Sequence, residues 1–178
     1  MNPKRWPTRC STWLQEARRT SPVASWRSAV ASSTERAAIE ALLPHRDPFL
    51  LVDRIVDRGD DWIETEWHVA EDLDVFRGHY PGNPVLPGVL ISEHCFQSAA
   101  LLVGNLTGDD AAPGVPVLTR IEDARFRRMV RPGHTLRTRV QQTDRLANAC
   151  WFTAQVTSEE GKIARLTFVL ALAEEPVK

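Results

Sequence analysis

Hydrophobic and polar residues alternate along much of the second half of the chain, which is the period-two pattern of half-buried strands. Between residues 162 and 172 one face is apolar throughout, while Arg165 and Thr167 lie on the other. The apolar face consists of Ala164, Leu166, Phe168, Leu170 and Leu172. Further strands are predicted at residues 117–130, 134–142 and 148–157. A polar turn at 159–162 predicts that the last two strands form a hairpin.

The first half of the chain predicts a short helix followed by two strands. The helix is expected over residues 38–43, because Pro44 stops it. The strands are expected at 49–56 and 62–69, with a polar turn at 58–61 between them.

Residues 87–103 differ, because apolar residues surround the whole axis of a predicted helix. Pro87 favours the start of this helix and Gly104 its end. The apolar positions are Val89, Leu90, Ile91, Cys95, Phe96, Ala99, Ala100, Leu101 and Leu102. Only a sheet that wraps around the helix could bury it on so many sides. We therefore expect an α+β fold, in which one long central helix is wrapped by an antiparallel sheet of about six strands.

The 178 residues allow one domain and a short appendage. We assign residues 38–178 to the folded domain and residues 1–37 to a basic, flexible N-terminal extension. Its richness in Arg and Ser and its shortage of acids resemble an organelle transit segment. An overlong start or a loosely docked helix would have the same composition, so all three interpretations stay open.

Composition excludes several classes of function. A formal net charge of −1 gives no reason to expect a nucleic acid as partner. No apolar run reaches the roughly 18 to 20 residues of a membrane-spanning helix, so no membrane is expected. The three cysteines are odd in number and have no CxxC spacing, which argues against a disulfide framework or a zinc site and favours the cytoplasm. The histidines lack the HExxH spacing, so no metal is predicted.

The candidate chemistry lies in the segment from Arg77 to Val89 and in the helix that follows. Three prolines and three glycines fix the backbone of this segment. It presents His79, and an imidazole can exchange a proton near neutral pH. Glu93 lies in the most apolar helix, where a carboxylate costs several kcal/mol unless it is paired. We predict that His79 and Glu93 are catalytic; for Glu93 alone, a buried ion pair remains an alternative.

Three segments resemble those of the bacterial 3-hydroxyacyl-[acyl-carrier-protein] dehydratases of the FabZ type. HYPGNPVLPGVLISEHCFQSA at 79–99 resembles the family's active-site stretch. LPHRDPFLLVDRI at 43–55 resembles its opening strand motif, and FRRMVRPGHTL at 126–136 its third block. The segments follow the family's order, and the resemblance covers about residues 38–173.

The resemblance implies a hot-dog fold and a tight homodimer with joined sheets, often assembled further into a trimer of dimers. It places His79 of one subunit beside Glu93 of the other. His79 would then take a proton from C2 of the substrate, and Glu93 would protonate or position the departing C3 hydroxyl. Backbone N–H groups at Gly88 and Val89 could stabilise the charge on the thioester oxygen. No cofactor is needed.

Further positions gain roles from the same resemblance. Gln97 would orient the carboxylate of Glu93 or a water molecule, and the side chains of Tyr80 and Phe96 would line the acyl tunnel. The residues expected to bind substrate are Tyr80, Pro87, Gly88, Val89, Phe96 and Gln97. Glu rather than Asp at position 93 favours a plain dehydratase over the family's double-bond-isomerising relatives.

Several positions depart from the family pattern. His94, Cys95 and Phe96 stand where small or slender residues are usual, which leaves the acyl length open and admits a specialised pathway such as polyene or polyketide synthesis. Asp47 replaces an aromatic residue, and His134 replaces an aspartate. Neighbouring helical residues point in different directions, so His94 and Cys95 are not expected to form a nucleophilic pair.

Charged residues outside the pair have less specific interpretations. The basic cluster is either a solvated face or a docking surface for an acidic acyl-carrier protein. It consists of Arg125, Arg127, Arg128 and Arg131. We interpret His45, Asp53 and Arg54 as structural.

The sequence therefore predicts an enzyme, a hydro-lyase that converts a (3R)-3-hydroxyacyl-[acyl-carrier-protein] to the trans-2-enoyl product. Fatty-acid or related synthesis would use this reaction. A hot-dog acyl-thioester hydrolase and a non-catalytic acyl-binding module are the alternatives, because one fold can serve several functions.

Overall fold

The computed structural model describes residues 33–104 and 114–173. The elements are α2 (Ser33–Leu42), β1 (Arg54–Arg58), β2 (Trp62–His68), the 3₁₀ helix η1 (Asp74–Arg77), α3 (Gly88–Gly104), β3 (Val115–Phe126), β4 (Thr135–Leu146), β5 (Ala149–Ser158) and β6 (Gly161–Ala173). Among these residues, no helix is both long and apolar enough to cross a bilayer.

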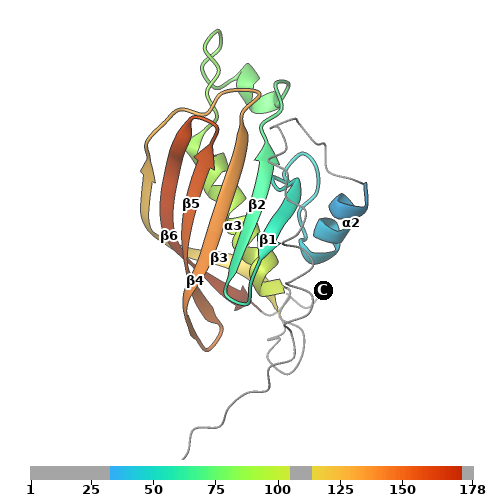
Figure 1. Ribbon diagram of the computed structural model, residues 1–178, viewed down its shortest axis with the longest axis vertical. Coiled ribbons are helices and arrows are strands. Elements are labelled where there is room, and N and C mark those ends of the chain that lie inside the picture. Colours follow the sequence, from blue (N-terminus) through green and yellow to red (C-terminus); the bar gives the residue numbers. More distant parts are fainter. Residues whose placement is uncertain (1–32, 105–113, 174–178) are drawn as a thin grey trace, which may run out of the picture.

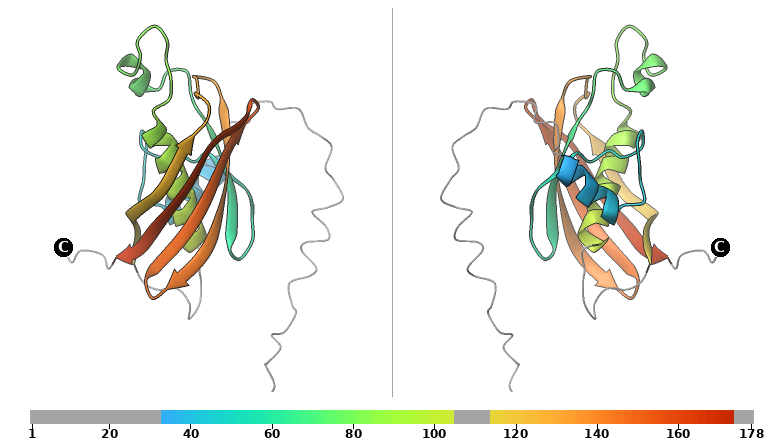
Figure 2. Two further views of the ribbon diagram at one scale, coloured as in Figure 1. Left: turned by 90° about the vertical axis from the view of Figure 1, so that its left-hand side faces the viewer. Right: turned by 90° about the vertical axis from the view of Figure 1, so that its right-hand side faces the viewer.

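The described strands form one antiparallel sheet in the order β1-β2-β4-β5-β6-β3. Hairpins join β1 to β2, β4 to β5 and β5 to β6, whereas β3 lies at the far edge and pairs only with β6. Figures 1 and 2 show the sheet curving around α3, which lies on its concave face. The predicted hot-dog fold is confirmed, because this is a central helix wrapped by a six-stranded antiparallel sheet.

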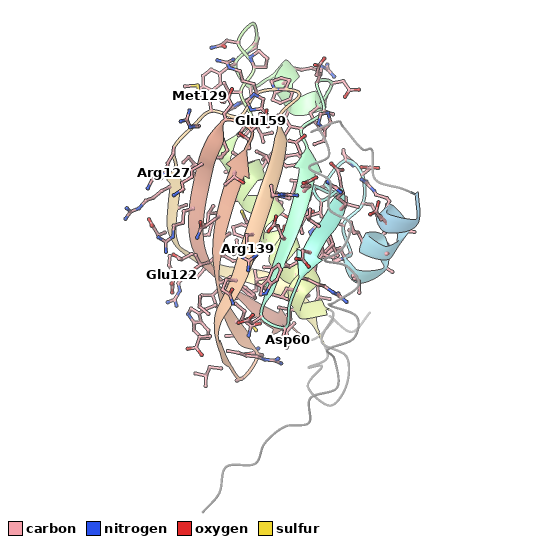
Figure 3. The ribbon with its side chains drawn as sticks, viewed as in Figure 1. Asp60, Glu122, Arg127, Met129, Arg139 and Glu159 are labelled. Carbon is pink, nitrogen blue, oxygen red and sulfur yellow. The ribbon has the colours of Figure 1, made fainter. Side chains whose placement is uncertain are left out.

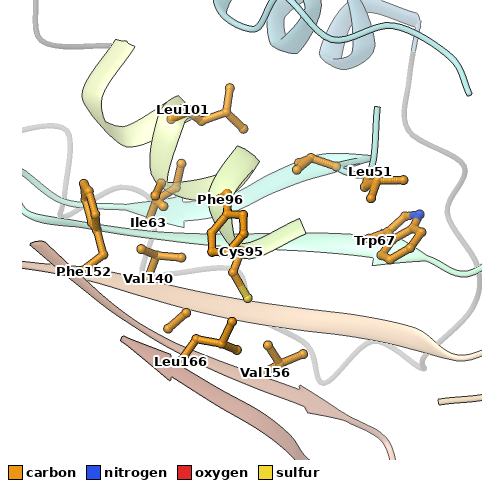
Figure 4. Close-up of a cluster of buried hydrophobic side chains, with 14 of the residues drawn as sticks. Leu51, Ile63, Trp67, Cys95, Phe96, Leu101, Val140, Phe152, Val156 and Leu166 are labelled. Atoms are coloured by element: carbon orange, nitrogen blue, oxygen red, sulfur yellow. The ribbon is translucent and has the colours of Figure 1, made fainter. Parts of the chain in front are cut away.

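The core forms between α3 and the inner face of the sheet. The Phe96 ring of α3 meets the Phe168 ring of β6 edge-on, with centroids 4.8 Å apart. Phe152 of β5 stacks on the Phe168 ring, with centroids 5.5 Å apart. Cys95 and Leu101 are also fully buried (Figure 4). Full burial of each such apolar side chain contributes about 1.5–3 kcal/mol, so this helix is the centre of the domain.

The segment 49–53 is not a strand, although the sequence analysis predicted one over 49–56. β1 begins only at Arg54. Leu50, Leu51 and Val52 are all buried in succession, so this run lacks the alternation of a half-buried strand. Part of its backbone bonds to side chains of α3 instead of a neighbouring strand.

Helix α2 begins at Ser33, five positions before the predicted start at 38. Ile39 faces the core, and Arg36 pairs with Glu40 one turn later, so an amphipathic helix extends through the predicted domain boundary at 37/38. The remainder of the predicted extension, residues 1–32, lies outside the described residues.

Strand β3 is an exposed edge. It ends at Phe126, four residues before the predicted end at 130, because the chain leaves the sheet after the Arg127 N–H donates to the Ile163 carbonyl. Four of its apolar side chains are 40–47% exposed; they are Val117, Leu118, Ile121 and Phe126. A long, apolar edge with free backbone groups is suited to pairing with another strand.

His94 is expected to make the stability of the fold dependent on pH. Its ring is fully buried in α3, and burial lowers its pKa from 6.5 to about 4, despite a hydrogen bond to the Leu51 carbonyl. Between these two pH values the unfolded chain binds a proton that the folded chain does not, so stability falls as the pH falls. The free energy of unfolding falls by about 3 kcal/mol between pH 6.5 and pH 4. Above pH 6.5 this histidine has little effect on stability.

Urea unfolding at pH 7.5 and at pH 4.5 measures this loss. His94→Leu should have a smaller difference between the two pH values than the original chain, even if it is less stable at both. His68→Leu, which changes an exposed histidine, should keep the original difference. An unchanged pH dependence in His94→Leu would contradict the assignment.

Candidate active site

The loop before α3 projects beyond one end of the sheet (Figure 1), and His79 belongs to this loop. The His79 N–H donates to the Val75 carbonyl of η1 at 2.9 Å. Tyr80 has a positive φ of 59° and Gly82 one of 83°, and the Asn83 N–H closes the turn on the Tyr80 carbonyl at 2.9 Å. The loop therefore has a fixed path, with Tyr80 held in a conformation that side chains other than Gly seldom adopt.

The ring of His79 has a defined orientation. Its Nδ1 lies 2.6 Å from the Val85 carbonyl oxygen. A carbonyl only accepts hydrogen bonds, so Nδ1 is the donor, and in the neutral ring Nε2 carries the lone pair. The Tyr80 ring packs against His79 edge-on, with centroids 4.6 Å apart. Nε2 is thus available to act as a base.

Glu93 lies in the second turn of α3, with 23% of its side chain exposed. The Gln97 amide donates to its Oε1 at 3.0 Å. The same amide donates to the Phe49 carbonyl at 2.8 Å and accepts from the Leu51 N–H at 2.8 Å. Gln97 therefore links the carboxyl group of Glu93 to the irregular segment beside the helix.

His45, which the sequence analysis interpreted as structural, lies beside Glu93. Its Nε2 is 3.5 Å from Glu93 Oε1, and 29% of its side chain is exposed. The sequence shows that His45 and Glu93 both lie in family-like segments, but not that the segments meet. Gln97 joins the two segments, because it donates both to Glu93 and to the Phe49 carbonyl four residues beyond His45.

The two predicted catalytic side chains do not meet within one chain. Among the described residues, His79 bonds to Val85, while Glu93 contacts Gln97 and His45, and no hydrogen bond or ion pair joins the two. A second copy of the chain is needed to test whether they converge, as the resemblance implies.

The start of α3 offers free backbone donors. Within the described part of the chain, the N–H groups of Gly88 and Val89 donate no hydrogen bond, as is usual for the first turn of a helix. The Pro87 carbonyl accepts from the Leu90 N–H at 3.0 Å. Phe126, which the sequence analysis did not single out, covers Gly88, where an added Cβ would lie 3.2 Å from its ring.

The predicted tunnel residues have different environments. Tyr80 is 62% exposed and Val89 is 74% exposed, so both are accessible from outside. Phe96 is only 8% exposed and lies between α3 and the sheet. Its position in the core gives no direct support to a role as tunnel lining in a single chain.

The unusual residues after Glu93 add bulk to the core. His94 and Cys95 are fully buried and face the sheet side of α3, where His94 packs against Trp67 with ring centroids 5.6 Å apart. Burial raises the pKa of the Cys95 thiol, which disfavours the reactive thiolate. Asp47 binds Arg36 at 2.6 Å, so it has a local partner in α2.

The predicted basic cluster divides into paired and unpaired groups. Arg125 pairs with Asp123 at 2.9 Å, and Arg131 donates to Asn83 Oδ1 at 2.7 Å. Arg127 and Arg128 form no ion pair among the described residues. Figure 3 shows Arg127 at the β3 edge of the sheet.

The remaining predicted structural residues lie at the other edge of the sheet. Arg54 pairs with Glu66 at 2.6 Å. Asp53 accepts from the His68 N–H at 2.6 Å, and burial raises the pKa of its carboxyl group despite this bond. His134 directly precedes β4, where its carbonyl accepts from the Val69 N–H at 2.9 Å, and its Nε2 lies 3.7 Å from Glu160 Oε1.

The FabA-like domain family matches residues 43–167, a span that contains both His79 and Glu93. The chain belongs to this family. Among its FabA-like relatives, a "3-hydroxyacyl-[acyl-carrier-protein] dehydratase FabZ" of Granulibacter bethesdensis is 40% identical over 134 residues, which cover 74% of this chain and 78% of the relative. The FabZ of Rhodospirillum rubrum is 36% identical, over 82% of this chain and 92% of its own length. The resemblance to FabZ-type dehydratases is confirmed.

Solved structures agree on the fold of this FabA-like chain. The "Dehydratase Heterocomplex ApeI:P" of Xenorhabdus doucetiae aligns with a TM-score of 0.64 at 16% identity, over 77% of this chain and 91% of that one. A hypothetical thioesterase of Streptococcus pneumoniae with coenzyme A aligns with a TM-score of 0.53 at 13% identity, over 82% and 100% of the two chains. At such low identities these structures support the fold alone.

Gln97→Met is expected to destabilise the protein by about 2–4 kcal/mol, because it leaves the buried Leu51 N–H and the Phe49 carbonyl without partners while conserving side-chain volume. Urea unfolding at pH 7.5 measures the change. Gln155→Met, the same substitution at an exposed position of β5, should change the stability by less than about 0.5 kcal/mol. Equal effects of the two substitutions would contradict the role given to the Gln97 amide.

Proposed function

We propose that this FabA-like chain dehydrates a (3R)-3-hydroxyacyl-[acyl-carrier-protein] to the trans-2-enoyl form, in fatty-acid or related synthesis. The observation that carries the proposal is the bond between His79 Nδ1 and the Val85 carbonyl, which leaves Nε2 as an oriented base. A carboxyl group at Glu93 and free N–H groups at the start of α3 supply the other parts that the reaction needs.

The proposed steps need no cofactor. His79 Nε2 takes the proton from C2 of the substrate, and the electrons of that bond form the C2–C3 double bond. Glu93 gives a proton to the C3 hydroxyl, which leaves as water when the C3–O bond breaks. The N–H groups of Gly88 and Val89 stabilise the negative charge on the thioester oxygen, at the positive end of the α3 dipole.

We further propose a homodimer that pairs the β3 edges of two chains into one continuous sheet. Two features of β3 support this arrangement: its apolar side chains are exposed, and among the described strands it pairs with β6 alone. The lack of contact between His79 and Glu93 within one chain supports it as well, since a partner's loop would have to bring His79 to Glu93. Assembly of dimers into a larger oligomer stays a prediction from the family.

The acidic carrier protein is proposed to dock beside Arg127 and Arg128. Arg127 lines a groove of about 230 Å³ together with Lys162 and Arg165, two residues that the sequence analysis did not include. None of these three cations forms an ion pair among the described residues, whereas Arg54 at the opposite edge binds Glu66. Unpaired cations favour an anionic partner.

Hydration of a crotonyl thioester, the reverse reaction, tests the chemistry through the loss of enoyl absorbance. His79→Ala and Glu93→Gln should each lower kcat/KM by about 100- to 10,000-fold, the usual worth of a general base or acid. His68→Ala should keep the original rate. Release of free thiol by the original chain, without interconversion of enoyl and hydroxyacyl forms, would indicate the hydrolase instead. Acyl binding with no turnover would indicate a binding module.

Arg127→Glu should raise the KM for a carrier-protein substrate about tenfold at low salt, and less at high salt, because charge reversal opposes an acidic partner. The KM for the corresponding small pantetheine thioester should not change. Arg58→Glu, at the exposed far edge in β1, is the matched control. A similar rise in KM for both substrates, or in both variants, would refute this docking site.

A further inference from the structure

The orientation of the Gln97 amide is fixed by its partners. Its oxygen accepts from the Leu51 N–H, which can only donate, and its nitrogen donates to the Phe49 carbonyl, which can only accept. The nitrogen is therefore also the atom that lies 3.0 Å from Glu93 Oε1. An N–H group of Gln97 points at this one carboxyl oxygen.

The His45 ring lies near the same oxygen. Its Nε2 lies 3.5 Å from Glu93 Oε1, and a hydrogen on Nε2 would make this contact attractive. The other ring nitrogen, Nδ1, is buried and has no hydrogen-bond partner within the described residues. The polar contact of the His45 ring is therefore with Glu93, and a purely structural role leaves that unexplained.

The loop does not need the His45 ring to keep its shape. Arg46 Nη1 donates to the carbonyls of Leu43 and His45 at 2.7 and 2.6 Å, and the Phe49 N–H donates to the Arg46 carbonyl at 2.8 Å. The backbone around His45 is thus held by its neighbours. Substitution of the ring should change what reaches Glu93 more than it changes the fold.

We propose that His45 is a positioning residue for Glu93: with Gln97 it occupies Oε1, so that Oε2 is the oxygen that exchanges a proton with the substrate. The Gln97 N–H takes one lone pair of Oε1 and the His45 ring lies 3.5 Å from the same atom, so Oε2 has more room for an acidic hydrogen. The proton of a protonated Glu93 therefore lies on Oε2, and the carboxyl group cannot rotate freely between its two oxygens. This inference rests on the proposed dehydratase function and adds a residue to it.

Substitutions at His45 distinguish a hydrogen-bond donor to Glu93 from a side chain that only occupies space. His45→Ala should lower kcat for crotonyl-thioester hydration about 10- to 100-fold with KM within about twofold, since substrate binding is kept and proton transfer is lost. His45→Gln should recover most of the rate, because its amide nitrogen can reach the position of Nε2. His45→Asn, whose amide corresponds to the position of Nδ1, should not. His68→Ala is the histidine control, and urea unfolding should find all variants folded.

A second measurement does not depend on turnover. In full-length protein labelled with 15N-histidine, the Nε2 resonance of His45 should report a bonded hydrogen and should shift in Glu93→Ala, while the resonances of His68 should not. A His45 resonance that ignores Glu93→Ala would overturn the contact. An active original chain with an unchanged kcat in His45→Ala, or with Gln no better than Asn, would overturn the role. An inactive original chain would refute the proposed dehydratase, and the resonances would still decide the contact.

Discussion

The hydrogen bonds of one buried amide, that of Gln97, determine how the candidate site is built. Residues 50–52 are buried outside the sheet, and buried backbone groups need partners. Gln97 accepts from the Leu51 N–H, and His94 bonds to the Leu51 carbonyl; Gln97 also donates to the carbonyl of the adjoining Phe49. Because Gln97 also donates to Glu93, the bonds that dock the segment on α3 orient the carboxyl group as well. Stability and chemistry therefore depend on the same side chain.

The two candidate catalytic groups belong to different kinds of element. His79 belongs to a loop whose conformation is fixed by turns and by the Val85 carbonyl, and Glu93 belongs to a helix fixed by the core. The loop and the helix do not bring His79 and Glu93 together in one chain, and β3 leaves an apolar edge uncovered. Pairing of two chains at this edge is the proposal that accounts for both observations, since it would cover the edge and complete the site.

The fold could be predicted because its signals are local. Period-two alternation located β4, β5 and β6, and the apolar residues around α3 indicated a buried helix. The strand predicted over 49–56 was wrong for residues 49–53, because an apolar run has the same composition whether it bonds to a strand or to buried side chains of a helix. The contacts of His45 with Glu93 and of Phe126 with Gly88 could not be predicted, since each joins segments distant in the chain. The sequence also could not show that Arg125 has an acidic partner while Arg127 forms no ion pair among the described residues.

The central claim is that each site combines His79 of one chain with Glu93 of another. Mixing His79→Ala with Glu93→Gln, under conditions that let subunits exchange, tests it directly. Half of the dimers would then be mixed and would hold one intact site of two, so crotonyl-thioester hydration should recover to about one quarter of the original rate. If both residues of a site came from one chain, each mixed dimer would contain only damaged sites. No recovery after verified exchange would contradict the account.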